Sequence, residues 1–326
     1  MSGQSELPLV KVIMAIHRPE HRLFQRMLDS VVAQNGVRCR IYAVIDGPAG
    51  TEEVILRQLS EAGAEIDVTW EALGVRAAFA RALERALATE EADPAAAFAY
   101  ADQDDVWHPD RLGEALDALR SSGATLVHCD ARVVSEAGRV IAPSLHRFER
   151  RSKNVTLLDH ILINAVTGMT ATFTPAVARL AAGLMRATGD GLLHDHVTAV
   201  AAAALGDVRW LDRPLVDYVQ HDGNVVGAVR RPKTAFLVLF WVFGLGAYRR
   251  GSARIYACRR ELVDALMQET GPKRTLSILF RTGRPWSGLR VYLRYGLECT
   301  RYLLRGRPRH WHLLVRCCDA ALFQRT

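Results

Sequence analysis

Short apolar runs alternate with segments of helical periodicity through the first 130 residues, and this alternation constrains the fold more than any other feature. The runs with the length and composition of buried strands are 9–16, 39–46, 65–70, 95–101 and 125–131. This pattern predicts an α/β fold with a mainly parallel sheet flanked by helices on both faces. Because ligands bind at the carboxyl ends of parallel strands, polar residues at those ends are the first candidates for a site.

Helical periodicity fills the gaps between these runs. The predicted helices are 20–35, 51–63, 75–90 after Gly74, and 109–121 beginning at Pro109. Later segments predict a strand at 167–173, a helix from Pro175, a helix at 195–205 and a strand at 208–218 with a break at Pro214. The polar stretch 147–154 between these two groups predicts a mobile loop.

Charge divides the chain of 326 residues into two regions. Residues 1–229 hold 22 Lys and Arg against 30 Asp and Glu, whereas residues 230–326 hold 20 against 5. We therefore expect a catalytic domain over 1–229 and a basic, mostly helical extension over 230–326. The six cysteines are scattered without a CxxC pair, which argues against a disulfide framework or zinc site and favours a reducing, cytoplasmic compartment. The N-terminus lacks the pattern of a signal peptide.

The loop after the fourth predicted strand carries the strongest functional signal. Asp102, Asp104 and Asp105 lie within four residues of one another. Such carboxylates repel unless a cation lies among them, and oxygen ligands favour Mg²⁺ or Mn²⁺. An acidic turn that only caps the next helix would need a single aspartate. The pattern therefore indicates a divalent-metal site that binds a diphosphate.

The run YADQDDVWHPDRL resembles the D-x-D motif of glycosyltransferase family 2, whose members are inverting enzymes with the GT-A fold. Strand IMAIHRP, the VIDG after the second strand, LHDH at 193–196 and YVQHDGNVVGA at 218–228 extend the resemblance to bacterial rhamnosyltransferase-like members over about residues 8–228. The chain departs from the family in reading Asp46-Gly47-Pro48 where a second aspartate is usual, and His17-Arg18 where Tyr-Asn is common.

The resemblance implies a role for each matching residue. On the donor side, Asp46 would contact the nucleobase with His17 nearby, and Asp102 would hold the ribose or diphosphate. Asp104 would bind the metal, with Asp102 beside it. His221 would supply a nitrogen ligand to the metal or a hydrogen bond to the diphosphate, and Asn224 would act similarly. A turn-forming role for Asp46 and a structural role for His221 remain open.

Asp195 opens the predicted helix 195–205 between His194 and His196. By resemblance it occupies the place of the catalytic base, which removes the proton of the acceptor hydroxyl. The alternative is an ordinary helix N-cap, a position that aspartate favours. The flanking histidines are weaker candidates for the base.

The extension combines an uncharged run at 235–248 with a basic stripe. The stripe consists of Arg290, Arg294, Arg301 and Arg305. The 4, 7 and 4 spacing of these arginines places them within about 60° of one another on a helix. They predict either an anchor on an anionic membrane surface or an ordinary appendage with a solvated basic face. No nucleic-acid-binding signature is present, so nucleic acid is not an expected partner.

Together these features predict an inverting glycosyltransferase. Its expected donor is a UDP-, dTDP- or GDP-sugar, and its expected acceptor is a glycan or a lipid-linked molecule in bacterial cell-surface polysaccharide synthesis. The expected location is cytoplasmic, on the inner face of the membrane. The alternatives are a sugar-phosphate nucleotidyltransferase, disfavoured because 17–24 lack the glycine of a phosphate loop, and a non-catalytic nucleotide-sugar-binding protein on the same fold.

Overall fold

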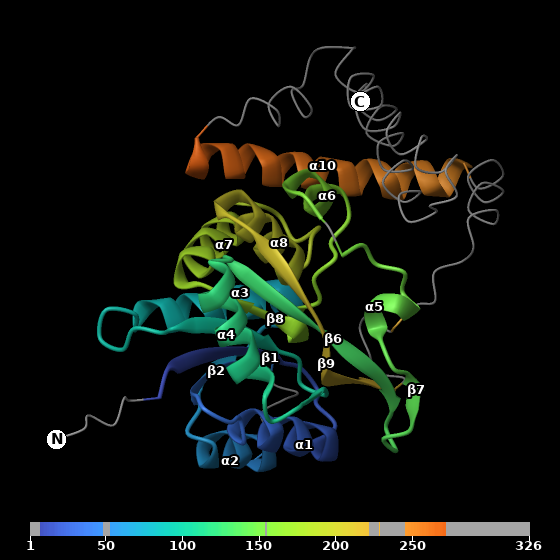
Figure 1. The fold of residues 1–326 in the computed structure, drawn as a ribbon. Helices are drawn as coiled ribbons and strands as arrows, with labels where there is room; N and C mark the ends of the chain where they lie inside the picture. The colour runs from blue at the N-terminus through green and yellow to red at the C-terminus, as the bar shows by residue number, and fades with distance from the viewer. Residues whose placement is uncertain (1–6, 48–52, 154, 222–227, 229–244, 272–326) are drawn as a thin grey trace.

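The computed structural model describes residues 7–47, 53–153, 155–221, 228 and 245–271. Within these ranges nine strands form one sheet, in the order β3-β2-β1-β4-β8-β6-β9-β5 with β7 paired to β6 (Figure 1). The strands are β1 (Leu9–Ile16), β2 (Arg38–Asp46), β3 (Glu65–Thr69), β4 (Ala97–Ala101), β5 (Val106–Trp107), β6 (Leu126–Ser135), β7 (Val140–Ala142), β8 (Ala171–Phe173) and β9 (Val208–Gln220).

The sheet is parallel over β3, β2, β1 and β4, as the alternating sequence pattern predicts. Beyond β4 it becomes mixed, because β8 enters antiparallel between β4 and β6. β9 then runs parallel to β6, with a register shift opposite Pro214, the expected break. β5 and β7, which the sequence pattern did not predict, are short antiparallel additions: β5 pairs with β9 at the far edge, and β7 pairs with the end of β6. The α/β class with flanking helices is confirmed.

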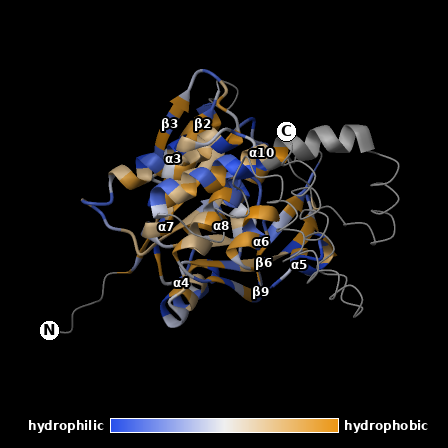
Figure 2. Ribbon diagram, turned by 90° about the horizontal axis from the view of Figure 1, so that it is seen from above, coloured by the Kyte–Doolittle hydropathy of each residue, from blue (hydrophilic) through white to orange (hydrophobic). Residues whose placement is uncertain are grey.

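Helices cover the two faces of the sheet. On one face lie α1 (His21–Val32), α2 (Glu53–Glu61) and α4 (Arg111–Ser122), which share one hydrophobic core with the sheet. On the other face lie α3 (Val75–Ala88), α6 (Leu157–Leu162), α7 (Pro175–Ala187) and α8 (His194–Leu205), which share a second core. Figure 2 shows the apolar α8 beside α6 and α7, in keeping with its almost complete burial.

Several local predictions need correction. The helix expected from Pro109 begins at Arg111, with Asp110 as its N-cap. The strand expected over 167–173 starts with a short 3₁₀ turn, Gly168–Thr170, and only Ala171–Phe173 pair in the sheet. The polar stretch 147–154 contains the end of α5 (Leu145–Phe148) and a network of hydrogen bonds through Arg151 rather than an unanchored loop.

Helix α10 (Leu245–Thr270) crosses over α6, α7 and α8 (Figure 1). Leu262, Val263 and Leu266 are fully buried in the same core as those helices. The helix ends before Gly271, whose φ of +80° suits glycine. No helix in the described ranges is long and apolar enough to cross a bilayer. The arginine stripe and residues 235–244 lie outside the described residues.

The burial of α10 generates a stability prediction. Leu262→Ala should lower the free energy of unfolding by about 2–5 kcal/mol, because it leaves a cavity between α10 and the helices beneath it. The control Gln268→Ala changes an exposed position of the same helix and should cost less than about 0.5 kcal/mol. Urea denaturation measures both. Equal, small losses would show that α10 does not share the core.

Candidate active site

The carboxyl ends of β1, β2 and β4 meet at one edge of the sheet, and hydrogen bonds join the loops that follow them. The backbone N–H of His17 donates to Oε1 of Gln103 at 2.8 Å, and Nε2 of Gln103 donates to the carbonyl of His17 at 3.0 Å. Nδ1 of His17 donates to the carbonyl of Asp46 at 2.8 Å. His17 and Asp46 thus lie together beside the D-x-D loop.

Asp46 is buried and organises the loop between β3 and α3. Its carboxylate accepts hydrogen bonds from the backbone N–H groups of Leu73 at 2.5 Å and Gly74 at 2.9 Å. The next residue, Gly47, has φ of +79°, which the turn requires. The aspartate therefore fixes two loops at the sheet edge and keeps little free acceptor capacity for another molecule.

The carboxyl groups of Asp102, Asp104 and Asp195 lie close together, since Asp104 and Asp195 both affect the pKa of Asp102. Burial, Asp104 and Asp195 together raise the pKa of Asp102 to about 7. Burial also raises the pKa of Asp195, to about 6. Since Asp195 comes from the start of α8, the fold brings together carboxylates that lie more than 90 residues apart in sequence.

His221 follows β9 directly and contacts the D-x-D motif. Its Nε2 lies 2.8 Å from Oδ2 of Asp104. Burial raises the pKa of Asp104, and the hydrogen bond from His221 opposes that rise. The structure therefore places His221 beside the residue that the sequence analysis assigned to the metal. Asn224, the weaker candidate from the same loop, lies outside the described residues.

The residues present fit a divalent cation only in part. Asp102 and Asp104 provide carboxylate oxygens, and burial raises the pKa of both, with the hydrogen bond from His221 opposing the rise at Asp104. Across the described ranges, however, no cluster of three or more His, Cys, Asp or Glu could hold a metal ion. A Mg²⁺ or Mn²⁺ ion bound by one or two carboxylates would take its remaining ligands from phosphate oxygens and water.

Asp105 plays a different part from its neighbours. It is fully buried, and its Oδ1 accepts the backbone N–H of Val219 at 2.9 Å. Its Oδ2 is buried without a hydrogen-bond partner, and burial followed by the nearby Asp104 raises its pKa well above the usual range. Asp105 therefore attaches the D-x-D loop to β9.

Asp195 lies in the first turn of α8 but does not cap it. The N-cap is Leu193, which makes no side-chain capping bond. Hydrogen bonds from the Gly168 and His196 backbones and from the Asn164 side chain, together with Arg151, oppose the effect of burial on the pKa of Asp195. The simple capping role that the sequence left open is thus not what the structure shows.

The flanking histidines are poor candidates for a base. His194 stacks on Phe79 at 3.7 Å between ring centroids, and burial lowers its pKa to about 3. Nε2 of His196 donates to the carbonyl of His160 at 2.7 Å, and burial lowers the pKa of His196 to about 4. Both rings are neutral parts of the core.

Sequence reasoning missed the residues that surround Asp195. Asn164 and Gly168 hydrogen-bond to it, and Arg151 lies close enough to lower its pKa. The sequence pattern predicts only a strand over 167–173 here, which does not point to Asp195. Arg151 was assigned to a mobile loop because its neighbours are polar, whereas its partners come from the distant segment 165–167.

The carboxylate cluster generates a prediction about pH. A carboxyl whose pKa is about 7 when folded and about 4 when unfolded binds more protons in the folded state, so its contribution to stability falls as pH rises through that window. In metal-free protein, Asp102→Asn should therefore gain stability over the natural protein between pH 5 and 7, by up to about 1.4 kcal/mol per pH unit. Urea denaturation in a chelating buffer measures the gain. The exposed-residue control Asp212→Asn should leave the pH slope unchanged; parallel curves for Asp102→Asn and the natural protein would contradict the cluster.

Solved structures of S. aureus TarS share this fold. S. aureus TarS 1–349 in complex with UDP-GlcNAc superposes with a TM-score of 0.52 at 14% identity, over 97% of this chain and 90% of that one. The same protein in complex with UDP gives a TM-score of 0.50 at 12% identity, over 97% and 90% of the two chains. These similarities confirm the expected GT-A-like fold. No curated protein sequence matches this chain.

The family model for glycosyl transferase family 2 matches residues 12–178, which is just over half of the chain. The matched region contains most of β1, all of β2 and the D-x-D loop, whereas Asp195 and His221 follow it in the sequence. The chain belongs to glycosyl transferase family 2.

Proposed function

We propose that this glycosyltransferase moves a sugar from a nucleotide-sugar donor to an acceptor hydroxyl with inversion, using a divalent metal and Asp195 as the base. The observation that carries the proposal is the meeting of Asp195 with Asp102 and Asp104 in one poorly solvated region. Asp102 and Asp104 serve the donor, and Asp195 serves the acceptor. The family match decides for glycosyl transfer over the nucleotidyltransferase and non-catalytic alternatives.

The donor occupies the carboxyl ends of β1, β2 and β4. His17 and Asp46 line the nucleobase side, where Asp46 acts mainly through the loop that it holds. Asp102 faces the ribose or the diphosphate. The exposed Trp70, on the loop that Asp46 fixes, offers a flat apolar surface close to the same side. That TarS binds UDP-GlcNAc supports a nucleotide-sugar as the class of donor.

Asp104 holds the metal, with Asp102 beside it and His221 either as a ligand or as a donor to the diphosphate. When bound, Mg²⁺ or Mn²⁺ neutralises the charge that develops on the departing diphosphate. Asn224 is proposed for the same side. His221 already hydrogen-bonds to Asp104, so it orients that carboxylate whether or not it ligates the ion.

Asp195 performs the proton transfer. It accepts the proton of the acceptor hydroxyl while that oxygen bonds to the anomeric carbon from the side opposite the diphosphate. The bond between the anomeric carbon and the diphosphate oxygen breaks, and the nucleoside diphosphate leaves with its electrons. A pKa of about 6 leaves Asp195 largely ionised at neutral pH and still basic enough to take a proton.

The acceptor is proposed to be a glycan or a lipid-linked molecule of bacterial cell-surface polysaccharide synthesis. What supports a membrane-bound acceptor is the basic character of residues 230–326, which carry 20 Lys and Arg against 5 Asp and Glu. Such a region favours an anionic membrane surface, and the cytoplasmic face of the cell membrane is the proposed location.

The base assignment predicts the behaviour of one isosteric substitution. Asp195→Asn keeps the size of the side chain but cannot take the proton, so turnover should fall by about 10²–10⁴-fold. Affinity for the nucleoside diphosphate in Mn²⁺ should stay within about twofold. A screen of UDP-, dTDP- and GDP-sugars by thermal stabilisation with Mn²⁺ first identifies the donor, and release of nucleoside diphosphate then measures turnover. Near-normal turnover by Asp195→Asn would remove this residue as the base.

The metal assignment predicts a separate loss. Asp104→Ala should abolish the Mn²⁺-dependent part of donor binding, because the ion loses its main protein ligand. The control Asp110→Ala removes an exposed carboxylate after the same loop and should bind donor normally. Isothermal titration with UDP, with and without Mn²⁺, measures both variants. Unchanged metal dependence in Asp104→Ala would contradict the assignment.

A further inference from the structure

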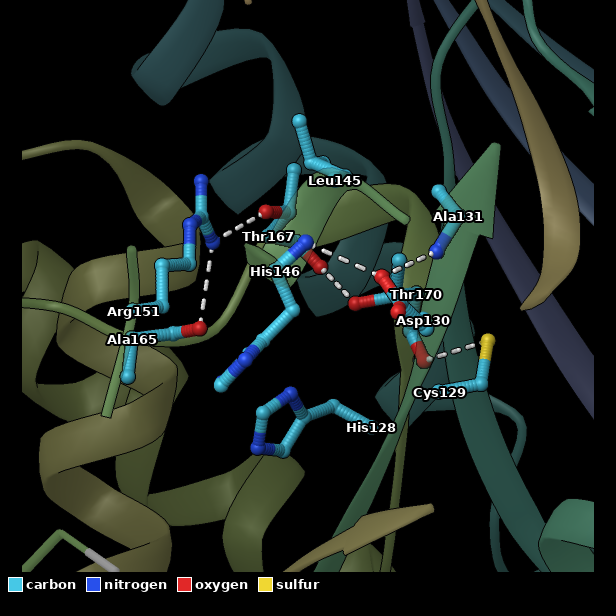
Figure 3. Close-up of a pocket in the computed structure, with 10 residues that line it drawn as sticks. All are labelled: His128, Cys129, Asp130, Ala131, Leu145, His146, Arg151, Ala165, Thr167 and Thr170. Atoms are coloured by element: carbon cyan, nitrogen blue, oxygen red, sulfur yellow. Dashed lines mark hydrogen bonds between the residues drawn. The ribbon is translucent and has the colours of Figure 1, made fainter. Parts of the chain in front are cut away.

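Arg151 connects the end of α5 to the segment before the 3₁₀ turn. Its Nη1 donates to the carbonyl of Ala165 at 3.1 Å and to Oγ1 of Thr167 (Figure 3). Its Nε and Nη2 both lie 2.8 Å from Oε2 of Glu149, which holds the guanidinium in place. One planar side chain therefore fixes two points on an irregular backbone that has no strand partner of its own.

The segment that Arg151 holds forms the wall around Asp195. The Asn164 side chain and the Gly168 backbone both hydrogen-bond to the carboxylate of Asp195. The amide of Asn164 also bonds to both backbone groups of Val166, at 2.7 and 3.0 Å, so its orientation depends on the path of this segment. Both contacts to Asp195 thus lie within three residues of the points that Arg151 holds.

Gly168 shows how closely this segment packs against the start of α8. A Cβ added there would lie 2.8 Å from Nε2 of His194 and 3.7 Å from Cβ of Asp195. The backbone at residue 168 consequently touches the first turn of α8, and a small displacement of the segment would change its contacts with Asp195.

The backbone before Arg151 is also unusual. Arg150 has φ of +54°, in the left-handed region that residues other than glycine rarely adopt. The same turn allows the backbone N–H of Arg151 to donate to the carbonyl of His146 at 2.9 Å. The chain accepts local strain in the turn that directs the Arg151 side chain toward residues 165–167.

We propose that Arg151 is a positioning residue for glycosyl transfer: through Ala165 and Thr167 it fixes the segment 164–168 that orients the carboxylate of Asp195. This inference rests on the proposed role of Asp195 as the base. The charged and titratable groups that influence Asp195 or are influenced by it are Asp102 at the end of β4, Arg151 in the loop after α5 and Tyr100 within β4. Arg151 supplies the positive charge in that set.

Arg151→Ala should lower turnover by about 10²-fold, because an error of about 1 Å in the position of a reacting group has an effect of this size. Affinity for UDP in Mn²⁺ should remain within about twofold, since Arg151 does not contact the donor side. Arg151→Lys, which keeps the charge but loses the forked geometry, should recover part of the turnover, and Thr167→Val should lose about tenfold. The matched control is Arg147→Ala, an exposed arginine of the same stretch, which should retain full turnover.

A double variant separates positioning from general damage. In the Asp195→Asn background, Arg151→Ala should cost less than about threefold more, because the group that it orients no longer takes the proton. An equal loss in both backgrounds, or weakened UDP binding in Arg151→Ala, would overturn the inference while leaving Asp195 as the base. Full turnover by Asp195→Asn would instead remove the base assignment, and the inference with it.

Discussion

The burial of carboxyl groups at the edge of the sheet is the constraint around which this site is organised. Asp102, Asp104, Asp105 and Asp195 come together where water is scarce, and burial raises the pKa of each. Hydrogen bonds offset the unfavourable burial of these carboxyl groups in different ways. Asp105 bonds to β9, His221 bonds to Asp104, and backbone and side-chain donors surround Asp195. A region that concentrates negative charge in this way is suited to a cation and the phosphates that accompany it.

Two guanidinium groups donate hydrogen bonds to the irregular backbone between α6 and β8. Between α6 and β8 the chain forms neither a helix nor a full strand, so its carbonyls need other donors. Arg151 donates to Ala165, and the fully buried Arg111 donates to Met169 and Ala171 at 2.7 to 3.2 Å. Arg111 also lies 3.7 Å above the ring of Trp107, which follows the D-x-D loop. Arg111 thereby links the segment before β8 to the strand that follows the D-x-D loop.

The regular part of this fold could be predicted from the sequence, and the irregular part could not. Strands β1, β2 and β4 and helices α1 and α3 appear where the apolar residues placed them, because these strands are apolar runs packed between the two cores and each helix buries one apolar face. Strand β5 and the turn at Gly168–Thr170 could not be predicted, because two or three residues are too few to show a periodic pattern of apolar side chains. The antiparallel entry of β8 beside β4 was equally hidden, since pairing between strands about 70 residues apart leaves no local signal.

The sequence by itself determined the chemical class of this protein. Aspartates at the ends of predicted strands, at the spacing of DQDD, indicated a metal-assisted diphosphate site, because that chemistry depends on residue type and local spacing. It also singled out Asp195. Only the tertiary structure decided what surrounds these carboxylates. Asp46 accepts hydrogen bonds from the backbone of Leu73 and Gly74, and His194 stacks on Phe79 in the core. Arg151 reaches the segment beside Asp195. The physical reason is that burial and hydrogen bonding set the protonation and orientation of a side chain, and both arise from segments that are distant in the sequence.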